Sequence, residues 1–367
     1  MTGGQALDFR LCELCAERQG EGHGLARTPH DEECFICRGL MATIPSRARE
    51  AAKKAKRFEF GTFSVGVSLP EGPQEREDEL RSVLKLKGSE TVKMQAARIV
   101  SELVAKTLEK KVDKTRPDLA LLVRFEGEVE ASSRPLFLYG RYAKPAGLPQ
   151  RTEACAKCSG RGCAACASIG FRRTPSVEGL IGEKVKRLTG GERTIFTWLG
   201  TEDRTSRVYP PGRPFVVEVK SPVKRRIPKN FRARSKRGEV SVSSCRIFRS
   251  KPTGLPRFKF RTRILGSAAS SVGVGGLANL HATFKRATVR FDRPHDKPAI
   301  KMVYSASAAS RGRRLVIEAE LDGGLPVKRF VTGELVSPSV SEVLGTDVIC
   351  KKFDILRVIE TGRFSYA

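Results

Sequence analysis

The chain has 367 residues, enough for about two or three domains that each bury a hydrophobic core. Its 68 Lys and Arg residues outnumber its 40 Asp and Glu residues, giving a formal net charge of +28, so the favoured partner is a polyanion, above all nucleic acid. No apolar run reaches the roughly 18 residues of a membrane span, and the N-terminus lacks the pattern of a secretory signal. We therefore expect a cytoplasmic protein with no membrane partner.

Eight of the ten cysteines fall in four C-x-x-C pairs, a spacing that indicates metal binding in a chain without a secretory signal. The first two pairs contribute the four cysteines nearest the N-terminus, Cys12, Cys15, Cys34 and Cys37. Zinc prefers four thiolates at the corners of a tetrahedron, and each pair supplies two of them from one tight turn. We therefore predict a zinc-binding module over residues 1–40.

The following segment combines helical and strand patterns. A basic, helix-prone connector at 41–57 leads into an alternating, strand-like stretch at 58–69. Helices are predicted at 75–84 and 90–111, the second with its apolar residues near one face, and a buried-type strand is predicted at 119–123. Periodicity alone indicates an α/β core here and no particular function.

The other two C-x-x-C pairs form a compact second quartet, Cys155, Cys158, Cys163 and Cys166. Gly160 and Gly162 lie between the pairs and let the chain fold back, so that both pairs can face one ion. The spacing is not that of a ferredoxin, so we predict a second zinc ion. This zinc site either only stabilises the local fold or, with Lys and Arg around it, also contacts RNA. The sequence leaves both roles open.

A helix is predicted over 176–188 with Ser176 as its N-cap, followed by short strands at 194–200 and 215–219. A basic run then covers 220–237. Such a run is either a solvated face or a surface that contacts phosphates, and the sequence leaves both open.

A carboxylate, Asp203, lies between these two strands, with Arg204, Arg207 and Arg213 near it in sequence. A Pro-Pro-Gly turn is predicted at 210–212. A carboxylate beside a turn and a buried-type strand is placed where catalytic groups are often found. The alternative is a loop Asp that only forms a salt bridge.

This stretch resembles the G-R-E-D-x-D-V-R…G-R-P-F signature of the archaeal and eukaryotic tRNA pseudouridine synthases that carry an N-terminal THUMP domain. The matching residues are Gly200, Glu202, Asp203, Arg207, Gly212, Arg213, Pro214 and Phe215. The resemblance implies that Asp203 is the nucleophile, Arg207 its ion-pair partner and Arg213 a substrate-binding residue. Thr201 departs from the family, whose Arg at that place helps to fill the space of the flipped base.

Other phrases beyond residue 57 resemble the same family in the same order. The sequence at 141–151 resembles its R-Y-x-K…L-P-Q-T entry into the catalytic domain. Phe260 stands where the family has a Tyr that stacks on the target base, and Leu344 belongs to a C-terminal phrase, so we expect both to form walls of the base pocket. Arg293 lies in a loosely matching basic motif and is expected to bind substrate.

The resemblance implies an α+β protein in three parts: the zinc module at 1–40, a THUMP-like tRNA-binding domain at 41–140, and a catalytic domain at 141–367. The catalytic domain is expected to have a mixed, mostly antiparallel sheet with flanking helices and the second cysteine quartet inserted at 155–166. The loop-like residues at 267–276 are expected to be flexible.

The implied activity is isomerisation of uridine to pseudouridine in the T-loop of tRNA, at position 54, position 55 or both. It needs no catalytic cofactor, and the sequence contains no nucleotide-binding motif. The missing Arg at Thr201, together with a missing C-terminal Arg, keeps a different class open: a zinc-containing THUMP protein that binds tRNA, or an RNA chaperone, without catalysis.

Overall fold

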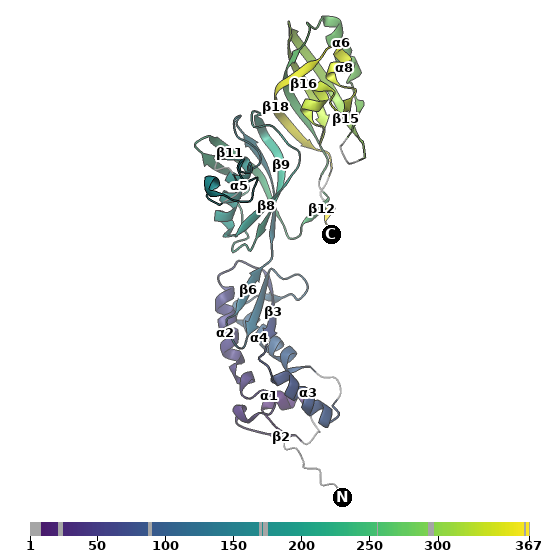
Figure 1. The fold of residues 1–367 in the computed structure, drawn as a ribbon. Helices are drawn as coiled ribbons and strands as arrows, with labels where there is room; N and C mark the ends of the chain where they lie inside the picture. The colour runs from purple at the N-terminus through teal and green to yellow at the C-terminus, as the bar shows by residue number, and fades with distance from the viewer. Residues whose placement is uncertain are drawn as a thin grey trace. The chain divides into compact units, whose positions relative to one another are not determined.

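The computed structural model describes residues 9–20, 25–86, 90–168, 171, 175–254, 256–292, 297–362 and 365–366. Its contacts divide the chain into two compact units (Figure 1). Unit 1 comprises Met1–Pro135 with Ser221–Arg225, and unit 2 comprises Leu136–Lys220 with Arg226–Ala367. Both units combine helices and sheets, so the predicted α+β class is confirmed.

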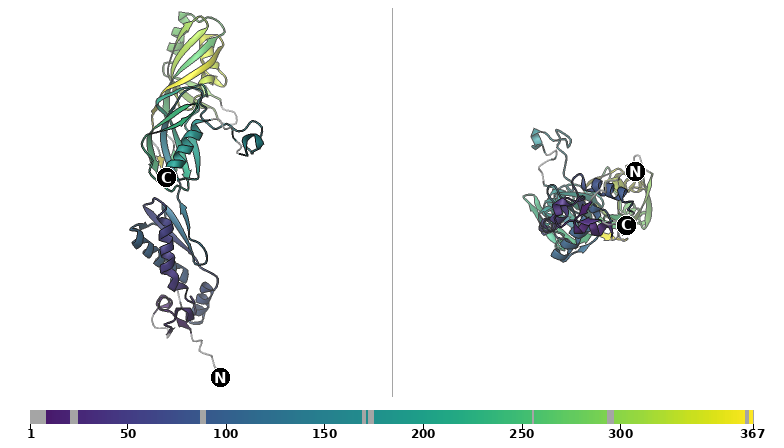
Figure 2. Two further views of the ribbon diagram at one scale, coloured as in Figure 1. Left: turned by 90° about the vertical axis from the view of Figure 1, so that its left-hand side faces the viewer. Right: turned by 90° about the horizontal axis from the view of Figure 1, so that it is seen from below.

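Unit 1 is built on a four-stranded sheet in the order β4 (Lys111–Val112), β3 (Thr62–Ser68), β5 (Leu119–Arg124), β6 (Glu130–Ser133). Strands β3 and β5 run parallel, and β6 is antiparallel to β5. The helices are α2 (Ile44–Ala55), α3 (Pro73–Val83) and α4 (Val92–Leu108), and the strands and helices predicted for this segment are confirmed with shifted ends. Helices α2 and α4 pack against each other and the sheet (Figure 2).

Helix α4 illustrates how the sequence determines this unit. Thr91 caps its N-terminus, because its hydroxyl accepts a hydrogen bond from the Met94 backbone N–H at 3.2 Å. The helix buries Val92, Ala96, Val100 and Val104, which recur every four residues. This apolar stripe is the one that predicts the helix, and it faces the core of unit 1.

The N-terminal cysteine segment shares that core. It contains α1 (Glu13–Gln19), the paired strands β1 (Arg10–Leu11) and β2 (Ala26–Arg27), and the 3₁₀ turns η1 (Asp31–Glu33) and η2 (Leu40–Thr43). Its buried apolar side chains belong to the same cluster as those of β3 and α4. Residues 9–40 therefore pack as part of unit 1 and do not form a separate core.

Unit 2 is organised around one large sheet. The strand order is β10-β11-β7-β9-β18-β13-β16-β15-β14-β17, and β8 pairs with β9. The pairs are antiparallel except for a single parallel bridge between β9 and β18, at Val208 and Ile355. The strands are β7 (Leu136–Lys144), β8 (Arg193–Trp198), β9 (Val208–Lys220), β10 (Phe231–Ser235), β11 (Gly238–Phe248), β13 (Phe258–Ala268), β14 (Ala287–Phe291), β15 (Ala299–Arg311), β16 (Arg314–Asp322), β17 (Val336–Ser337) and β18 (Val348–Glu360).

Four α-helices accompany this sheet in the described part of unit 2: α5 (Val177–Thr189), α6 (Val274–Thr283), α7 (Val327–Thr332) and α8 (Val340–Leu344). The predicted capping of α5 is confirmed, since the Ser176 hydroxyl accepts from the Gly179 backbone N–H at 3.0 Å. A separate two-stranded pairing joins β12 (Pro252–Gly254) to β19 (Ser365–Tyr366).

Three local expectations need correction. A domain boundary at 140 would cut through β7, which is paired on both sides by β9 and β11, so unit 2 begins at Leu136. The turn predicted at 210–212 lies within the bounds of β9, where it forms an irregularity: the pairing with β7 shifts register between Arg213 and Val208. The loop predicted at 267–276 is shorter, since β13 continues to Ala268 and α6 begins at Val274.

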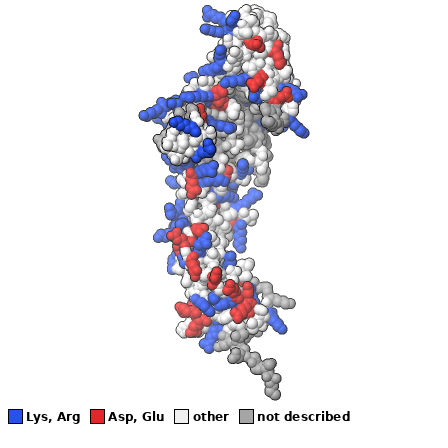
Figure 3. Space-filling view, viewed as in Figure 1, with Lys and Arg blue, Asp and Glu red and all other residues white. Residues whose placement is uncertain are grey.

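The positive charge is unevenly distributed along the chain. Residues 1–135 carry 23 Lys and Arg against 22 Asp and Glu, whereas residues 136–367 carry 45 against 18. In Figure 3 the two signs are interspersed over unit 1, while Lys and Arg predominate around α5 and β11. The excess of positive charge therefore lies mainly in unit 2, and such an excess favours a polyanionic partner. Among the described helices, none is long and apolar enough to cross a membrane.

Candidate active site

Asp203 lies in the loop that connects β8 to β9, at a cavity of about 220 Å³. The cavity is enclosed by segments that are far apart in sequence: this loop, β13, the turn after β16, α7 and β18. The side chains that matter for its chemistry are Asp203, Arg213, Phe260, Leu325, Lys328 and Phe353. The lining also includes Glu202, so the fold places two carboxylates, one of them exposed, with two cations and several apolar groups around a single hollow.

The carboxylate of Asp203 forms an ion pair with the ammonium of Lys328, the second residue of α7. The Asp203 Oδ2 and Lys328 Nζ atoms are 2.8 Å apart, and the two side chains are 37% and 54% exposed. The hydrogen bond that Lys328 donates to Asp203 raises the pKa of Lys328 above its ordinary value. The carboxylate is thus held by a cation on one side while it remains accessible from the cavity.

The expected ion pair between Asp203 and Arg207 is wrong. Arg207 directly precedes β9, where neighbouring side chains point to opposite faces, and Val208 occupies the buried face. The Arg207 side chain is therefore exposed, with its guanidinium carbon 5.6 Å from the centre of the Tyr209 ring. Its backbone N–H donates to Asp354 Oδ1 at 2.7 Å, which fixes the start of β9.

Glu202, the neighbour of Asp203, is buried in a polar network beneath the loop. Tyr142 donates its hydroxyl to the two Glu202 carboxylate oxygens, at 2.6 and 2.8 Å, and the Gln150 amide donates to Oε2 at 3.1 Å. The guanidinium of Arg213 lies 3.4 Å from Oε2. Burial raises the pKa of Glu202 above its usual range, and burial together with Glu202 raises that of Tyr142.

Lys144 fastens the loop to β7 from the other side. Its ammonium donates to three backbone carbonyl oxygens, those of Leu148 at 2.8 Å, Asp203 at 3.1 Å and Ser206 at 2.6 Å. Burial lowers the pKa of Lys144 to about 8. Because Lys144 bonds the carbonyl of Asp203 itself, it restricts the backbone from which the exposed carboxylate projects.

Arg213 forms the floor of the cavity and explains one glycine in the signature. Its Nη1 donates to the Thr201 carbonyl at 2.8 Å, and its guanidinium carbon lies 5.8 Å from the centre of the Phe260 ring. Gly200 has φ +93°, and a Cβ there would overlap the Arg213 guanidinium. Only glycine allows this close approach in this backbone conformation.

The structure brings together some of the predicted site residues and separates others. Phe260 is 4% exposed and its ring contributes to the cavity wall. Leu344 is not among the lining residues, because it ends α8 and packs in the core near Gly276 of α6, so its expected place in the wall is wrong. Leu325 and Phe353 form that wall instead. Arg293 lies outside the described residues.

The sequence did not identify Tyr142, Lys144, Gln150 or Lys328 as site residues. The first three belong to the R-Y-x-K…L-P-Q phrase, in which buried polar residues stand in and beside an apolar strand. Buried polar side chains need hydrogen-bond partners, so this combination predicts a polar network beside the strand and could have identified these three residues. Lys328 carries no such local signal, since only the sheet topology brings α7 to the loop.

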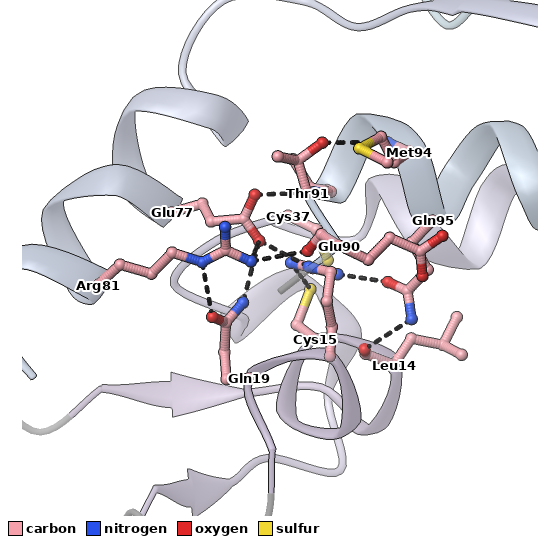
Figure 4. Close-up of polar contacts among 12 residues, drawn as sticks. Leu14, Cys15, Gln19, Cys37, Glu77, Arg81, Glu90, Thr91, Met94 and Gln95 are labelled. Atoms are coloured by element: carbon pink, nitrogen blue, oxygen red, sulfur yellow. Dashed lines mark hydrogen bonds and ion pairs between the residues drawn. The ribbon is translucent and has the colours of Figure 1, made fainter. Parts of the chain in front are cut away.

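The first cysteine quartet forms one cluster. The sulfur atoms of Cys12, Cys15, Cys34 and Cys37 all lie within 4.8 Å of one another, and all four residues are buried. Arg18 lies beside them, with Nη2 3.5 Å from Cys15 Sγ and Nε 2.6 Å from Glu77 Oε1, and it also hydrogen-bonds Gln95. Figure 4 shows Cys15 together with Glu77 of α3 and Gln95 of α4. These contacts connect the cluster to α3 and α4.

The second quartet also forms a single cluster, with all sulfur atoms within 4.8 Å. It belongs to the connection between β7 and α5, which includes the 3₁₀ turn η3 (Ala164–Cys166) and stands away from the sheet (Figure 2). Its hydrophobic cluster consists of the four cysteines themselves. Four converging thiol groups are the donor set of a structural zinc site, and both quartets fit such an ion.

Comparison with known proteins gives consistent matches. The model for the archaeal Pus10 THUMP domain matches residues 47–123, and the model for the Pus10 C-terminal domain matches residues 137–250. A protein of Nitrosopumilus maritimus is 30% identical, with 88% of this chain and 84% of the relative covered, and one of Cenarchaeum symbiosum is 34% identical, with 90% and 82% covered. One of Korarchaeum cryptofilum is 30% identical, with 91% and 95% covered.

These three relatives share the name tRNA pseudouridine synthase Pus10. Among solved structures, a chain of the archaeal box H/ACA sRNP Nop10–Cbf5 complex aligns with 59% of this chain and 47% of its own length. The TM-score is 0.31 and the identity 11%, too low a likeness to bear on the site.

Proposed function

The chain belongs to the Pus10 family of tRNA pseudouridine synthases, and from this premise we propose that it isomerises uridine to pseudouridine in the T-loop of tRNA, at position 54, position 55 or both. The observation that carries the proposal is the accessible Asp203 carboxylate, held by Lys328 at the mouth of a cavity with apolar walls. A tRNA substrate also implies action in the cytoplasm.

The reaction breaks the bond between N1 of uracil and C1′ of ribose, and it forms a bond between C5 and C1′. Asp203 serves either as the nucleophile that attacks C1′ or as the base that removes a ribose proton, and both routes need its ionised carboxylate. After the new bond forms, the proton on C5 leaves to solvent and N1, freed from the ribose, takes up a proton, so that no atom is gained or lost overall. The reaction involves no net oxidation and no group from a second substrate, so we propose that these residues act without a catalytic cofactor.

The cavity supports this chemistry in two ways. The target base must leave its stack before a carboxylate can reach its ribose. The freed uracil must then turn without escaping, which requires a closed and partly apolar space. Phe260, Leu325 and Phe353 provide apolar walls, and the buried Arg213 provides hydrogen-bond donors at the floor.

Phe260→Ala is expected to slow turnover by roughly tenfold to a hundredfold, because an aromatic platform contributes about 1–3 kcal/mol per stacked base. Since Phe260 also belongs to the core, Phe260→Leu serves as the matched control that keeps apolar volume and removes the ring. Phe260→Tyr should be tolerated. Single-turnover rates on tRNA, with thermal unfolding recorded for each variant, test this role. An Ala variant as fast as wild type would remove Phe260 from the site.

Both cysteine quartets are proposed to bind structural zinc. The purified protein should then contain about two zinc ions per chain, measured by elemental analysis. The double change Cys12→Ser and Cys15→Ser should remove one equivalent and destabilise unit 1, since these residues belong to its core. Cys245→Ser, outside both quartets, should leave the metal content unchanged. A fully folded wild type without metal would contradict the assignment.

The position of the modified base is tested on an unmodified tRNA transcript. Carbodiimide labelling followed by primer extension should map pseudouridine to the T-loop, and changing each T-loop uridine to cytidine identifies which one is used. Product elsewhere in the tRNA would contradict the T-loop proposal. Tight tRNA binding without any product would favour the alternative, an RNA chaperone.

A further inference from the structure

A second hollow adjoins the cavity of Asp203. Its volume is about 510 Å³, within the range of about 300–1,000 Å³ that is usual for ligand sites. Gly200 and Gly324 line both hollows, so the two spaces lie side by side and share a wall. The hollow lies between the start of β13, the start of β15 and the turn after β16.

The shared wall is a tight glycine turn that is fixed at both sides. The Gly323 N–H donates to the Phe258 carbonyl at 2.6 Å, and the Lys301 ammonium donates to the Gly323 carbonyl at 2.8 Å. A Cβ on Gly323 would collide with both the ring and the backbone of Phe258. Glycine at this turn therefore allows the backbone to lie directly against Phe258, beside the hollow.

The hollow carries cations that no carboxylate of the described residues neutralises. Arg257 is exposed, and its guanidinium forms no ion pair with a carboxylate among the described residues. Lys301 bonds only a neutral carbonyl there. The one acidic residue of the lining, Asp322, already accepts hydrogen bonds from the Met302 N–H and the Tyr304 hydroxyl, each at 3.4 Å. Arg257 and Lys301 outnumber this carboxylate, so the lining carries a net positive charge that favours an anion.

The hollow also offers apolar surface for a base. Phe258 is half-buried in its wall, and the side chain of Ile300 is 66% exposed. An aromatic ring and an exposed aliphatic side chain beside two cations are the combination used to bind nucleotides in single-stranded RNA. A neighbouring nucleotide is one phosphodiester link away from a base that enters the Asp203 cavity.

We propose that this hollow holds the nucleotide adjacent to the target uridine, with its phosphate on Arg257 and Lys301 and its base against Phe258. The proposal rests on the proposed function, since it assumes an RNA strand whose target base occupies the Asp203 cavity. A contact with this neighbouring phosphate stabilises the bound substrate and the transition state equally. It therefore lowers the enzyme concentration needed for half-saturation and leaves the maximal rate unchanged.

Arg257→Gln tests the phosphate contact, with Arg313→Gln as the matched control, because Arg313 is exposed in the turn between β15 and β16 and does not line the hollow. In single-turnover reactions, Arg257→Gln should raise the half-saturating enzyme concentration about fivefold and reduce the salt slope of tRNA binding by about 1. The maximal rate should stay within about twofold of wild type. Lys301→Gln should act in the same direction, and Arg257→Lys should restore most of the affinity.

A T-arm minihelix with an uncharged methylphosphonate at one linkage beside the target uridine locates the contact. The neutral linkage should weaken binding to wild type and to Arg313→Gln, but cause no further loss in Arg257→Gln, because the two changes remove the same interaction. Equal losses in all three proteins at both flanking linkages, or an Arg257→Gln variant indistinguishable from Arg313→Gln, would overturn the subsite. Wild-type product formation tests the proposed function separately.

Discussion

Asp203→Asn is expected to reduce the rate of pseudouridine formation by roughly 10³-fold or more, because the change nearly preserves the shape of the side chain and removes its anionic oxygen. Binding of tRNA should remain within about twofold of wild type, since affinity depends on many cations spread over unit 2. Single-turnover rates and filter binding measure the two effects on the same preparations.

The control for this variant follows from the structure. Glu202→Gln is unsuitable as a test of charge alone, because Glu202 is buried and bonded to Tyr142, Gln150 and Arg213. Asp347→Asn is better matched, since Asp347 is exposed in unit 2 and does not line the cavity. Asp347→Asn should behave as wild type. If Asp203→Asn also turned over near the wild-type rate, the proposed catalytic role of Asp203 would be wrong.

Lys328→Met is expected to slow the reaction by roughly tenfold to a hundredfold, the usual size of a positioning effect at a reacting group. The methionine side chain has about the volume of the lysine side chain, but it cannot form the ion pair with Asp203 Oδ2. Because the pair is largely solvent-exposed, its loss should change the free energy of unfolding by less than about 1 kcal/mol. Single-turnover rates and chemical denaturation separate these two outcomes.

Lys328→Arg should recover part of the rate, since it restores a cation at the same position. The hydrogen bond to Asp203 raises the pKa of Lys328, so the ammonium form is favoured at and below its ordinary titration range and is lost only as the pH rises through the raised value. Any rate loss near neutral pH must therefore come from another group. A Lys328→Met enzyme as fast as wild type would show that the ion pair plays no part in catalysis.

The sequence predicted those features that depend on local signals. The cysteine spacing identified both quartets, whose members the fold brings together. The apolar stripe identified α4, and the capping residue Ser176 identified the start of α5. The family resemblance pointed to Asp203 and Phe260, which line the same cavity. Each of these inferences used residues that lie within a few positions of one another, or a phrase carried over whole.

The errors concern contacts between distant segments. The ion pair was assigned to Arg207, a close neighbour of Asp203 in sequence, whereas the pairing of β9 with β18 and the placement of α7 bring Lys328 to the carboxylate. Leu344 was assigned to the wall because its phrase matched the family, but α8 directs it into the core beside α6. Residue proximity in a large sheet depends on strand order, which hydrophobic periodicity does not determine.

The most direct test of the proposed activity is the release of tritium from tRNA transcribed with uridine labelled at C5. Isomerisation replaces the C5–H bond by the new bond to ribose, so wild-type protein should release tritium from its target uridines in proportion to pseudouridine formed, without added cofactor. Asp203→Asn should bind the same tRNA and release almost none. Wild-type protein that is fully folded and binds tRNA tightly, yet releases no tritium, would contradict the assignment of a pseudouridine synthase.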